Sequence, residues 1–346
     1  MRRLSNTGDL EEETSFTDEN ASIVVPWFEL QRALIRNLLL YSGRDIAGDD
    51  DSTECEMDLL FLGSELESMN LDDADHVDLK FANGQQCIAR LVIGADGNLS
   101  KVRALLFDES SPEFAGSCIW RMFLEGDYPE LDDGISCVWT GDGKVLAMQK
   151  MGTRVYLSGQ AAWPEDKLHL LDRKRYIGVE DGSDSGGTTK NESRLQRFVE
   201  NFQSFPSGPI TFVSKNCVTT SILEHPIYFR PPGRPWGVGR VTLIGDAAHM
   251  MPPNMAMGTP LALEDAVSLG HNLIKFGLTP KGLREYEAER QPRVNRIADT
   301  AIRQTGKYYK EKDDSANPFR MNNADMWKFI TDFSQEPIPS YESEET

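Results

Sequence analysis

Two segments of the chain combine residue types that could bind a ligand carrying hydroxyl groups and an anionic group. The first runs from Val92 to Arg103 (VIGADGNLSKVR) and the second from Leu243 to Pro253 (LIGDAAHMMPP). Each reads as a buried strand, a tight turn of glycine and aspartate, and then a helix. The aspartate can accept hydrogen bonds from sugar hydroxyls, and the first N–H groups of a helix are free to face an anion. A single Gly-Asp turn is a modest signal, because such turns also occur where nothing binds.

Other candidate sites have less support. Residues 184–187 (DSGG) resemble the nucleophile loop of trypsin-like proteases, but they lie in a very polar stretch without a fitting His and Asp arrangement. His249 could act as an acid or a base, although packing beneath the loop is the favoured interpretation. The five histidines are far apart in sequence, so no metal site is predicted. The five cysteines are scattered without a C-x-x-C pair, which is typical of reduced thiols in a cytosolic protein.

Charge and hydropathy limit the partners. The chain has 36 basic and 55 acidic residues, for a net charge of −19, and a surface this negative repels nucleic acid and anionic lipid. No apolar run is long enough to span a membrane. The first residues are followed by acidic sequence and not by an apolar signal segment, so we expect a cytoplasmic protein. The hydrophobic share of 39% is that of an ordinary globular chain.

Periodicity predicts the elements around the two turns. A helix is expected over residues 28–40, and strands over residues 77–82 and 86–93 flank the hairpin signal Asn83-Gly84. The second of these strands is apolar enough to be central in a sheet. A helix with a Thr-Pro start is expected over residues 259–276, and another begins at Thr279, with Pro292 kinking or breaking it.

The middle of the chain predicts an antiparallel sheet. Residues 117–163 alternate in β fashion around turns at residues 141–143 and 152–153. Residues 181–193 contain no apolar residue and are expected to form a flexible insertion, followed by a helix over 194–205 and strands over 218–229. Three tryptophans of this region could line an aromatic pocket or lie in the core, and the sequence leaves both possibilities open: Trp120, Trp139 and Trp163.

The two turn segments, in this order and about 150 residues apart, are far more specific together than alone. They resemble the second and third fingerprints of the class A FAD-dependent monooxygenases, the group of p-hydroxybenzoate hydroxylase. The Met-Pro-Pro continuation and the helix at residues 286–293 (YEAERQPR) look most like the branch of salicylate hydroxylases and tetracycline-inactivating enzymes. The resemblance extends from Val24 to Thr305.

This resemblance implies FAD as the cofactor, NAD(P)H as co-substrate and an aromatic or polyketide-like small molecule as the substrate, in specialised metabolism. Asp246 would bond the ribityl chain, the turn of Asp96 would lie near the pyrophosphate, and the β-rich segment would cover the substrate. The resemblance assigns no catalytic residue. The residues expected at the flavin are Asp246, Gly245, Met257, Gly258, Thr259, Asp96, Gly97 and Arg103.

The sequence departs from the family pattern where the flavin would be held. The chain has no strand, G-x-G-x-x-G turn and helix, the unit whose N–H groups hold the pyrophosphate. Trp27 stands where the family usually has an arginine. Residues 256–260 (AMGTP) replace a G-Q-G-x-N turn, and Pro260 has no N–H to offer.

These departures leave several hypotheses open beside the monooxygenase. One is a flavin-independent cyclase or isomerase on the same scaffold, and another is an inactive partner that docks a sheet edge onto a full-length relative. A further alternative is that the DNA upstream of Met1 encodes the absent unit in frame. Substrate, regiochemistry, preference for NADH or NADPH, and oligomeric state are not readable from the residues.

The expected fold is α/β (α+β), a truncated FAD/NAD(P)-binding Rossmann-like domain with an inserted antiparallel β-sheet substrate domain and C-terminal helices. Deleting the first unit exposes strand edges and apolar helix faces, so a partner chain, a second copy or a rearranged sheet is expected to cover them. The predicted limits are residues 1–21 for a flexible arm, 22–110 with 231–310 for the FAD-binding domain, 111–230 for the substrate domain, and 311–346 for a C-terminal helix and tail.

Overall fold

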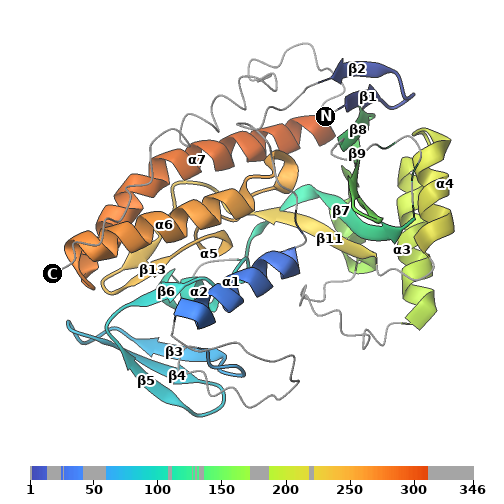
Figure 1. Ribbon diagram of the computed structural model, residues 1–346. Coiled ribbons are helices and arrows are strands. Elements are labelled where there is room, and N and C mark those ends of the chain that lie inside the picture. The colour runs from blue at the N-terminus through green and yellow to red at the C-terminus, as the bar shows by residue number, and fades with distance from the viewer. Residues whose placement is uncertain are drawn as a thin grey trace.

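Three β-sheets and the helices packed against them form the part of the chain that the computed structural model describes (Figure 1). The described residues are 2–13, 25, 27–41, 60–107, 111–126, 128, 131, 136–171, 187–217 and 222–310. The elements follow in the order β1 (Arg2–Ser5), β2 (Leu10–Glu13), α1 (Trp27–Tyr41), β3 (Leu66–Asn70), β4 (Val77–Phe81), β5 (Gln86–Ala89), β6 (Val92–Gly94), α2 (Lys101–Phe107), β7 (Glu113–Glu125), β8 (Ser136–Gly141), β9 (Lys144–Met151), β10 (Arg154–Ala162), α3 (Gly187–Phe202), α4 (Ser207–Asn216), β11 (Leu223–Phe229), β12 (Gly237–Val238), β13 (Val241–Leu243), α5 (Asp246–His249), α6 (Gly258–Phe276) and α7 (Pro280–Lys310). None of the described helices has the length and apolar character needed to cross a membrane. The predicted mixture of helices and sheets is confirmed.

The large sheet has the strand order β11-β7-β10-β9-β8-β1-β2. Its strands from β7 to β11 pair antiparallel with their neighbours, and β7 lies opposite β10 from Ser117–Ala162 to Glu125–Arg154. The predicted turns are present: Asp142, Gly143 and Gly152 have positive φ angles where the hairpins reverse. The antiparallel sheet expected over residues 117–163 is therefore confirmed.

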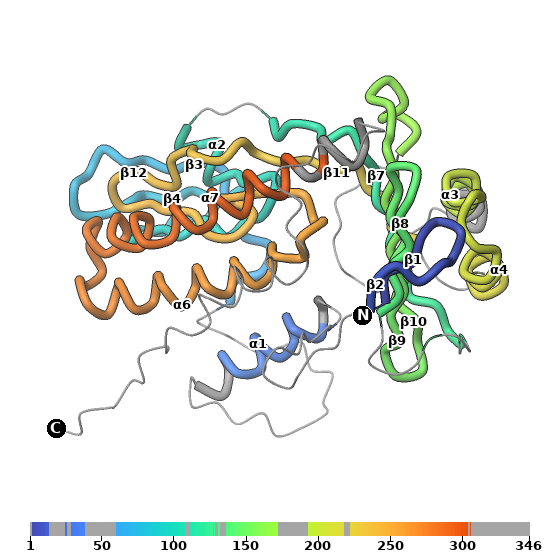
Figure 2. Tube along the Cα trace, turned by 90° about the horizontal axis from the view of Figure 1, so that it is seen from above, coloured from blue at the N-terminus to red at the C-terminus, as the bar shows by residue number. Residues whose placement is uncertain are grey.

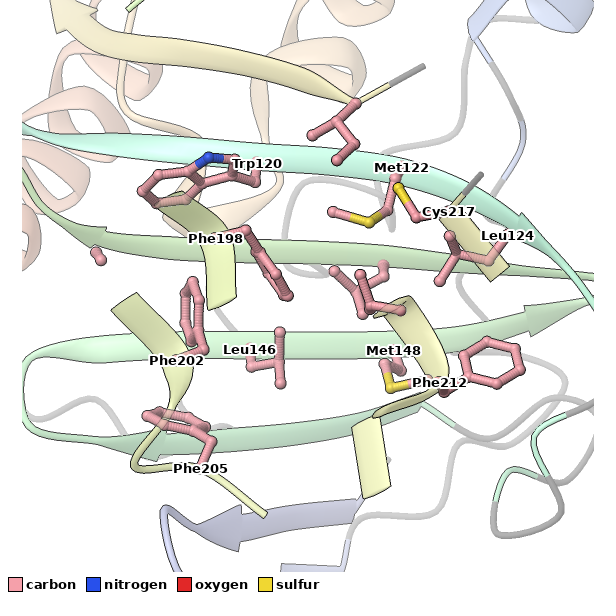
Figure 3. Packing of buried hydrophobic residues seen from close by; sticks show 14 of the residues in the cluster. Trp120, Met122, Leu124, Leu146, Met148, Phe198, Phe202, Phe205, Phe212 and Cys217 are labelled. Atoms are coloured by element: carbon pink, nitrogen blue, oxygen red, sulfur yellow. The ribbon is translucent and has the colours of Figure 1, made fainter. Parts of the chain in front are cut away.

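Helices α3 and α4 cover one face of this sheet. The side chains of Trp120, Met122 and Leu124 lie on the same face of β7, and Phe198 and Phe202 of α3 contact Trp120 edge to face (Figure 3). The three tryptophans whose place was open are all buried in this core: Trp120, Trp139 and Trp163. The core interpretation is therefore the correct one, since the hydrophobic rings exclude water between sheet and helices.

The expectation for the segment before these helices is partly wrong. Helix α3 begins at Gly187, inside the stretch expected to be a flexible insertion, and it ends at Phe202. Residues 181–186 lie outside the described residues. Helix α4 was not predicted, although its buried residues Pro209, Phe212 and Val213 have helical spacing. Of the strands expected over 218–229, β11 is present from Leu223, and residues 218–221 are outside the described residues.

The start of the chain is not a free arm in residues 2–13. Strand β1 pairs parallel with β8 and antiparallel with β2, so both extend the large sheet. Leu4 packs against the core, and Arg2 and Arg3 form ion pairs with the acidic residues of β2. The polar composition suggested an arm, but the cross-strand charge pairs make the same residues suitable for an edge hairpin. Residues 14–21 lie outside the described part.

A second sheet, ordered β12-β13-β6, carries the two Gly-Asp turns, and α6 and α7 pack beside it (Figure 1). Pro292 does not end α7, although a proline inside a helix removes one hydrogen bond and crowds the preceding turn. The helix continues because it is buried on both sides of the proline. Tyr286 lies before it, and Val294 and Ile297 lie after it, all fully buried. Of the two outcomes expected at Pro292, the break is therefore wrong, and the kink stays a prediction.

The strand expected over residues 86–93 is divided between two sheets. The hairpin at Asn83-Gly84 is confirmed, since β4 and β5 pair around it. However, β5 is the outer strand of the order β3-β4-β5, and Ile88 is 71% exposed, so its predicted central place is wrong. Residues Arg90 and Leu91 carry the chain out of that sheet to β6, which pairs with β13. Apolar composition alone does not distinguish a buried strand from a partly exposed one.

Candidate functional site

The two Gly-Asp turns lie beside each other. Strands β6 and β13 pair parallel with Gly94 opposite Leu243, and the N–H of Ile244 donates to the carbonyl of Gly94 at 3.0 Å. Because the carboxyl ends of parallel strands meet at one edge of a sheet, both turns emerge there, the usual position of ligands in open α/β sheets. Helix α2 follows the first turn and the short helix α5 follows the second.

Gly94 makes the close approach of these elements possible. A β-carbon at this position would lie 2.5 Å from the side chain of Leu243 and 2.9 Å from that of Val102. Both neighbours are buried, so neither can move away without opening the core. The glycine therefore has a packing role where β6, β13 and α2 converge.

The first aspartate is used by its own turn. Asp96 accepts hydrogen bonds through Oδ2 from the backbone N–H groups of Lys101 at 2.7 Å and Val102 at 3.0 Å. Its Oδ1 accepts from the hydroxyl of Ser100 at 2.5 Å. These bonds satisfy free N–H groups at the start of α2, as an N-cap does. Gly97 beside it has a φ of 74° and open space around the missing β-carbon.

Arg103 connects the first turn to the second. Its side chain is fully buried, with Nε donating to the carbonyl of Ala247 at 2.6 Å and Nη2 donating to that of Ala248 at 2.8 Å. Both acceptors belong to α5. Its contact with the flavin stays a prediction, and these two hydrogen bonds show that Arg103 also supports the second turn.

The second turn exposes its aspartate. Gly245 has φ 57° and ψ −143°, a conformation that residues with a β-carbon rarely adopt, and Asp246 follows it as the first residue of α5. The Asp246 side chain is accessible to solvent, whereas the other residues of α5 are buried. In the described part of the chain, no donor hydrogen-bonds to its carboxylate.

Asp246 lies beside the start of α6. An atom built at the β-carbon position of Gly258 would have one neighbour within reach, Oδ1 of Asp246 at 4.0 Å. The protein atoms around Asp246 raise the pKa of its carboxyl by removing water, although the charges of His249 and Arg121 act in the opposite direction. A solvent-accessible carboxylate thus lies next to a helix start that carries no side chain.

A buried ionic network supports this turn from below. Asp265 on α6 is fully buried and accepts hydrogen bonds from the N–H of Gly245 at 3.0 Å, from His249 Nε2 at 2.6 Å and from Arg290 Nε at 2.8 Å. Burial alone would raise the pKa of Asp265, but these hydrogen bonds and the charge of His249 outweigh it, so the pKa is lowered. Arg290 also pairs with Glu264 at 2.8 Å. The network fixes the backbone of Gly245 by a charged acceptor.

His249 belongs to this support. Its ring is buried, lies 5.3 Å from the ring of Trp236, and binds Asp265 through Nε2. Trp236 in turn lies 5.8 Å from Tyr286, whose hydroxyl donates to the carbonyl of Leu243 at 3.2 Å. This chain of contacts joins α7 to β13 and to the second turn. The favoured packing interpretation of His249 agrees with this geometry.

The residues that lead from α5 into α6 differ in their exposure to solvent. Met257 is buried in the same core cluster as Met255, so its side chain is not exposed to a ligand from solvent. Ala256 has a left-handed φ of 54°, which turns the chain into α6. Thr259 is exposed beside Gly258. Gly258 and Thr259 therefore stay predicted ligand contacts, and Met257 stays one through its backbone.

Two residues that position the turn were missed. Asp265 and Arg290 meet across two helices, and nothing in the local sequence around Asp265 marks it as different from a surface aspartate. Arg290 stands inside the YEAERQPR segment that carries the family resemblance, and this was the available signal. Within the described ranges, no three or more His, Cys, Asp or Glu side chains lie together as metal ligands would.

Comparisons with known proteins agree with this geometry. The FAD binding domain family matches residues 233–301, which contain the second turn and its supporting helices. The aurachin C monooxygenase/isomerase of Stigmatella aurantiaca is 30% identical over 277 residues, covering 80% of this chain and 63% of that protein. The phenazine 1,6-dicarboxylic acid hydroxylase PhzS of Lysobacter antibioticus is 31% identical over 229 residues, covering 62% of this chain and 53% of that protein.

Among solved structures, Klebsiella pneumoniae HpxO complexed with FAD and uric acid has a similar fold. The TM-score is 0.63 at 23% identity, covering 81% of this chain and 64% of that one. The fold and the paired turns define a flavoprotein-type α/β domain joined to a large, mostly antiparallel sheet. The chain belongs to the class A flavin monooxygenase family, as the two Gly-Asp segments predicted. It spans less than two thirds of the length of both curated relatives.

Proposed function

We propose that this chain forms the flavin-ring and substrate portion of an FAD-dependent monooxygenase. Its substrate would be an aromatic or polyketide-type small molecule in specialised metabolism, with NAD(P)H as the reductant. The names of the aurachin and phenazine relatives support this substrate class. The domain limits at residues 110/111 and 230/231 are part of the proposal, and they fit the start of β7 at Glu113 and the end of β11 at Phe229.

The observation that carries the proposal is the place of Asp246 beside Gly258. The carboxylate has free acceptor capacity at the carboxyl edge of a parallel sheet, and the missing side chain of Gly258 leaves room in front of it. These features fit a polyhydroxyl chain next to a flat ring, which is the ribityl and isoalloxazine part of FAD. Gly245 and Thr259 adjoin Asp246 and Gly258 in the sequence and would be the next residues at the flavin.

The protein would contribute position and exclusion of water, while FAD, when bound, supplies the reaction with oxygen. Asp246 would accept hydrogen bonds from ribityl hydroxyls. Asp265, held by His249 and Arg290, would keep the second turn in the conformation that presents Asp246. The face of the large sheet opposite α3 and α4 would cover the substrate.

The test is the visible absorbance of the purified 346-residue protein after addition of FAD and removal of the excess. We expect a retained flavin band at about 450 nm, a wavelength that is a property of the cofactor itself. Asp246→Ala should weaken FAD binding about tenfold or more, because hydrogen bonds to a charged group are lost. Asp299→Ala is the matched control, since Asp299 is a surface residue on α7 paired with Arg303.

A folded protein that takes up no FAD would contradict the proposal. Conversion of a substrate by such a colourless protein would favour the flavin-independent cyclase or isomerase. The AMGTP turn at residues 256–260 motivates this second candidate, because Pro260 has no N–H and the side chain of Met257 is turned into the core.

We further propose that a second copy or a partner chain covers β6 and that the protein acts in the cytoplasm. In the order β12-β13-β6, no described strand pairs with the outer edge of β6, and Ile93 is 40% exposed there. An unpaired strand edge favours association. Light scattering of the purified protein tests this: a monomer at all concentrations would contradict the second copy.

A further inference from the structure

The large sheet has two unlike faces. Figure 2 shows α3 and α4 on one side of it and α1, α6 and α7 on the other. The face toward α3 carries the apolar core. Because side chains alternate along a strand, the opposite face of β7 carries Ile119, Arg121 and Phe123. A charged residue thus lies near the middle of the face that is turned toward the flavin-type domain.

Arg121 differs from Arg197 and Arg154, two arginines on or beside this sheet, in its hydrogen-bond partners. Arg197 forms two hydrogen bonds with Glu224, each 2.7 Å long, and Arg154 pairs with Glu125 at 2.7 Å. Arg121 is half-buried, and its Nε is inaccessible to solvent without a hydrogen-bond partner. Within the described ranges, no hydrogen bond or ion pair joins its guanidinium to another residue. A buried donor atom without an acceptor is unfavourable, so a bound ligand that offers an acceptor to the Nε of Arg121 would be favoured.

The neighbours of Arg121 suit an aromatic ring. Ser158 on β10 and Leu223 on β11 lie opposite it in the register, so its two flanks are small or apolar. One pair further along the same face, Phe123 and Tyr156 lie opposite each other with ring centroids 5.2 Å apart. Aromatic side chains pack favourably against a flat ring at such distances.

Arg121 also faces the side on which Asp246 lies. Its positive charge lowers the pKa of the Asp246 carboxyl, although no ion pair joins the two groups. The two side chains are therefore near enough to interact through space and too far apart to bind each other. A molecule held at Arg121 would lie on the same side of the sheet as the flavin contact proposed for Asp246.

We propose that Arg121 binds the negatively charged oxygen group of an aromatic substrate, with the Phe123 and Tyr156 rings beside the substrate ring. The group is a carboxylate or an ionised hydroxyl, both of which match the planar N–H pattern of a guanidinium. The inference rests on the proposed function, because it assigns the substrate of that same site. Arg121 is then a specificity-determining residue of the sheet face.

The test is isothermal titration calorimetry of the purified 346-residue protein without flavin, using three probes. The first two are 2-naphthoate and its neutral analogue 2-naphthamide, and the third is 4-nitrophenolate at alkaline pH. We expect one of the two anions to bind about tenfold or more tightly than the amide, since hydrogen bonds to charged groups are the strong ones. The anion that binds tells a carboxylate from an ionised hydroxyl.

Substitutions locate the effect. Arg121→Gln should remove the preference for the anion and leave binding of 2-naphthamide unchanged, while Arg121→Lys should keep part of it through the remaining charge. Arg154→Gln is the matched control, because it removes an arginine paired at the exposed end of β10 and should keep the whole preference. Circular dichroism checks each fold, and Arg121→Met, which keeps the aliphatic stem, replaces R121Q if that variant unfolds.

Two results would overturn the inference. One is equal affinity of the unsubstituted protein for anions and amide, including no binding of any probe. The other is an anion preference that survives in folded R121Q or R121M. Uptake of FAD is measured separately, so a lost anion preference with intact FAD binding leaves the proposed function standing. An anion preference without FAD binding contradicts only the proposed function.

Discussion

Asp96 and Asp246 follow the same sequence pattern on neighbouring strands, yet the structure uses them differently. Both carboxylate oxygens of Asp96 accept hydrogen bonds from N–H and hydroxyl donors of its own turn. Asp246 has no described hydrogen-bond donor, and its turn is held instead by Asp265 beneath it. A carboxylate whose hydrogen bonds are satisfied inside the protein stabilises the fold, whereas one supported by other residues and left open can serve a ligand.

Breaking the support under the second turn should have the largest effect. Asp265→Ala leaves Arg290 and His249 buried without their acceptor, so we expect the free energy of unfolding to fall by about 3–5 kcal/mol. Urea denaturation followed by circular dichroism measures it. Asp299→Ala, on the surface of α7, should change the free energy of unfolding by less than about 0.5 kcal/mol. A loss of similar size in both variants would show that the network has no special role.

Asp265 should also make the free energy of unfolding depend on pH. Because the pKa of Asp265 is lowered in the folded state, its stabilising effect is present above the unfolded value of about 3.9. It is lost as the pH falls through the lowered pKa. Asp265→Asn should therefore lose less stability than the unsubstituted protein when urea denaturation is repeated from neutral pH down to acid. Equal losses in both proteins would contradict the assignment.

A substitution that crowds the packing between the two turns should have the next largest effect on the free energy of unfolding. Gly94→Ala introduces a methyl group 2.5 Å from the buried Leu243 side chain, so we expect a destabilisation of about 1–3 kcal/mol. Gly97→Ala is not a suitable comparison, because Gly97 has a positive φ. Gly270 in α6 is a better control, since nothing lies near its missing β-carbon and alanine favours a helix. A G94A variant as stable as G270A would show that the strands can move apart freely.

Substituting each of the two aspartates in turn sharpens the comparison. Asp96→Ala should lower the free energy of unfolding by about 0.5–2 kcal/mol, as loss of a helix cap does. Asp246→Asn should not destabilise the protein at neutral pH, because the surrounding protein atoms raise the pKa of this carboxyl by displacing part of its water and so disfavour its charged form in the folded state. Flavin uptake should show the opposite order, with the larger loss in D246N. Equal effects of the two variants on uptake would remove the distinction.

The smallest effect on stability is expected at Gly258. Alanine there meets only Asp246 Oδ1 at 4.0 Å and lies at the first position of α6, so the free energy of unfolding should change by less than about 0.5 kcal/mol. FAD binding should nevertheless weaken, because the methyl group enters the space assigned to the flavin ring. Unchanged FAD binding in a folded G258A protein would place the ring elsewhere.

The sequence allowed the turns to be found but not what holds them. Gly94, Asp96, Gly245 and Asp246 belong to short local patterns, whose chemistry is visible in consecutive residues. The contact between Asp265 and Arg290 depends on how two helices cross, which a local pattern does not encode. Arg103 belongs to the first motif, but its hydrogen bonds to the carbonyls of α5 could not be predicted, because burial is a tertiary property.

Long-range pairing explains the other differences. The β1 strand has its partner in β8, far along the chain, so residues 2–5 look like a polar arm when viewed alone. The unpartnered state of Arg121 depends on the register of β7 with β10 and β11. The alternating sheet over residues 117–163 was predictable because hairpins pair neighbours in sequence.

The parallel pairing of β6 with β13 has a consequence for how the protein folds. Strands β7 to β11 of the large sheet lie between these two strands in the sequence, so the contact of β6 with β13 closes a loop of about 150 residues. Contacts of such high sequence separation slow folding, because the chain loses conformational entropy in closing the loop before the contact can stabilise it. We expect the hairpins of the large sheet to form early and the two Gly-Asp turns to meet late. Native-state hydrogen exchange would then show the amides of β6 and β13 opening more readily than those of β7 and β10.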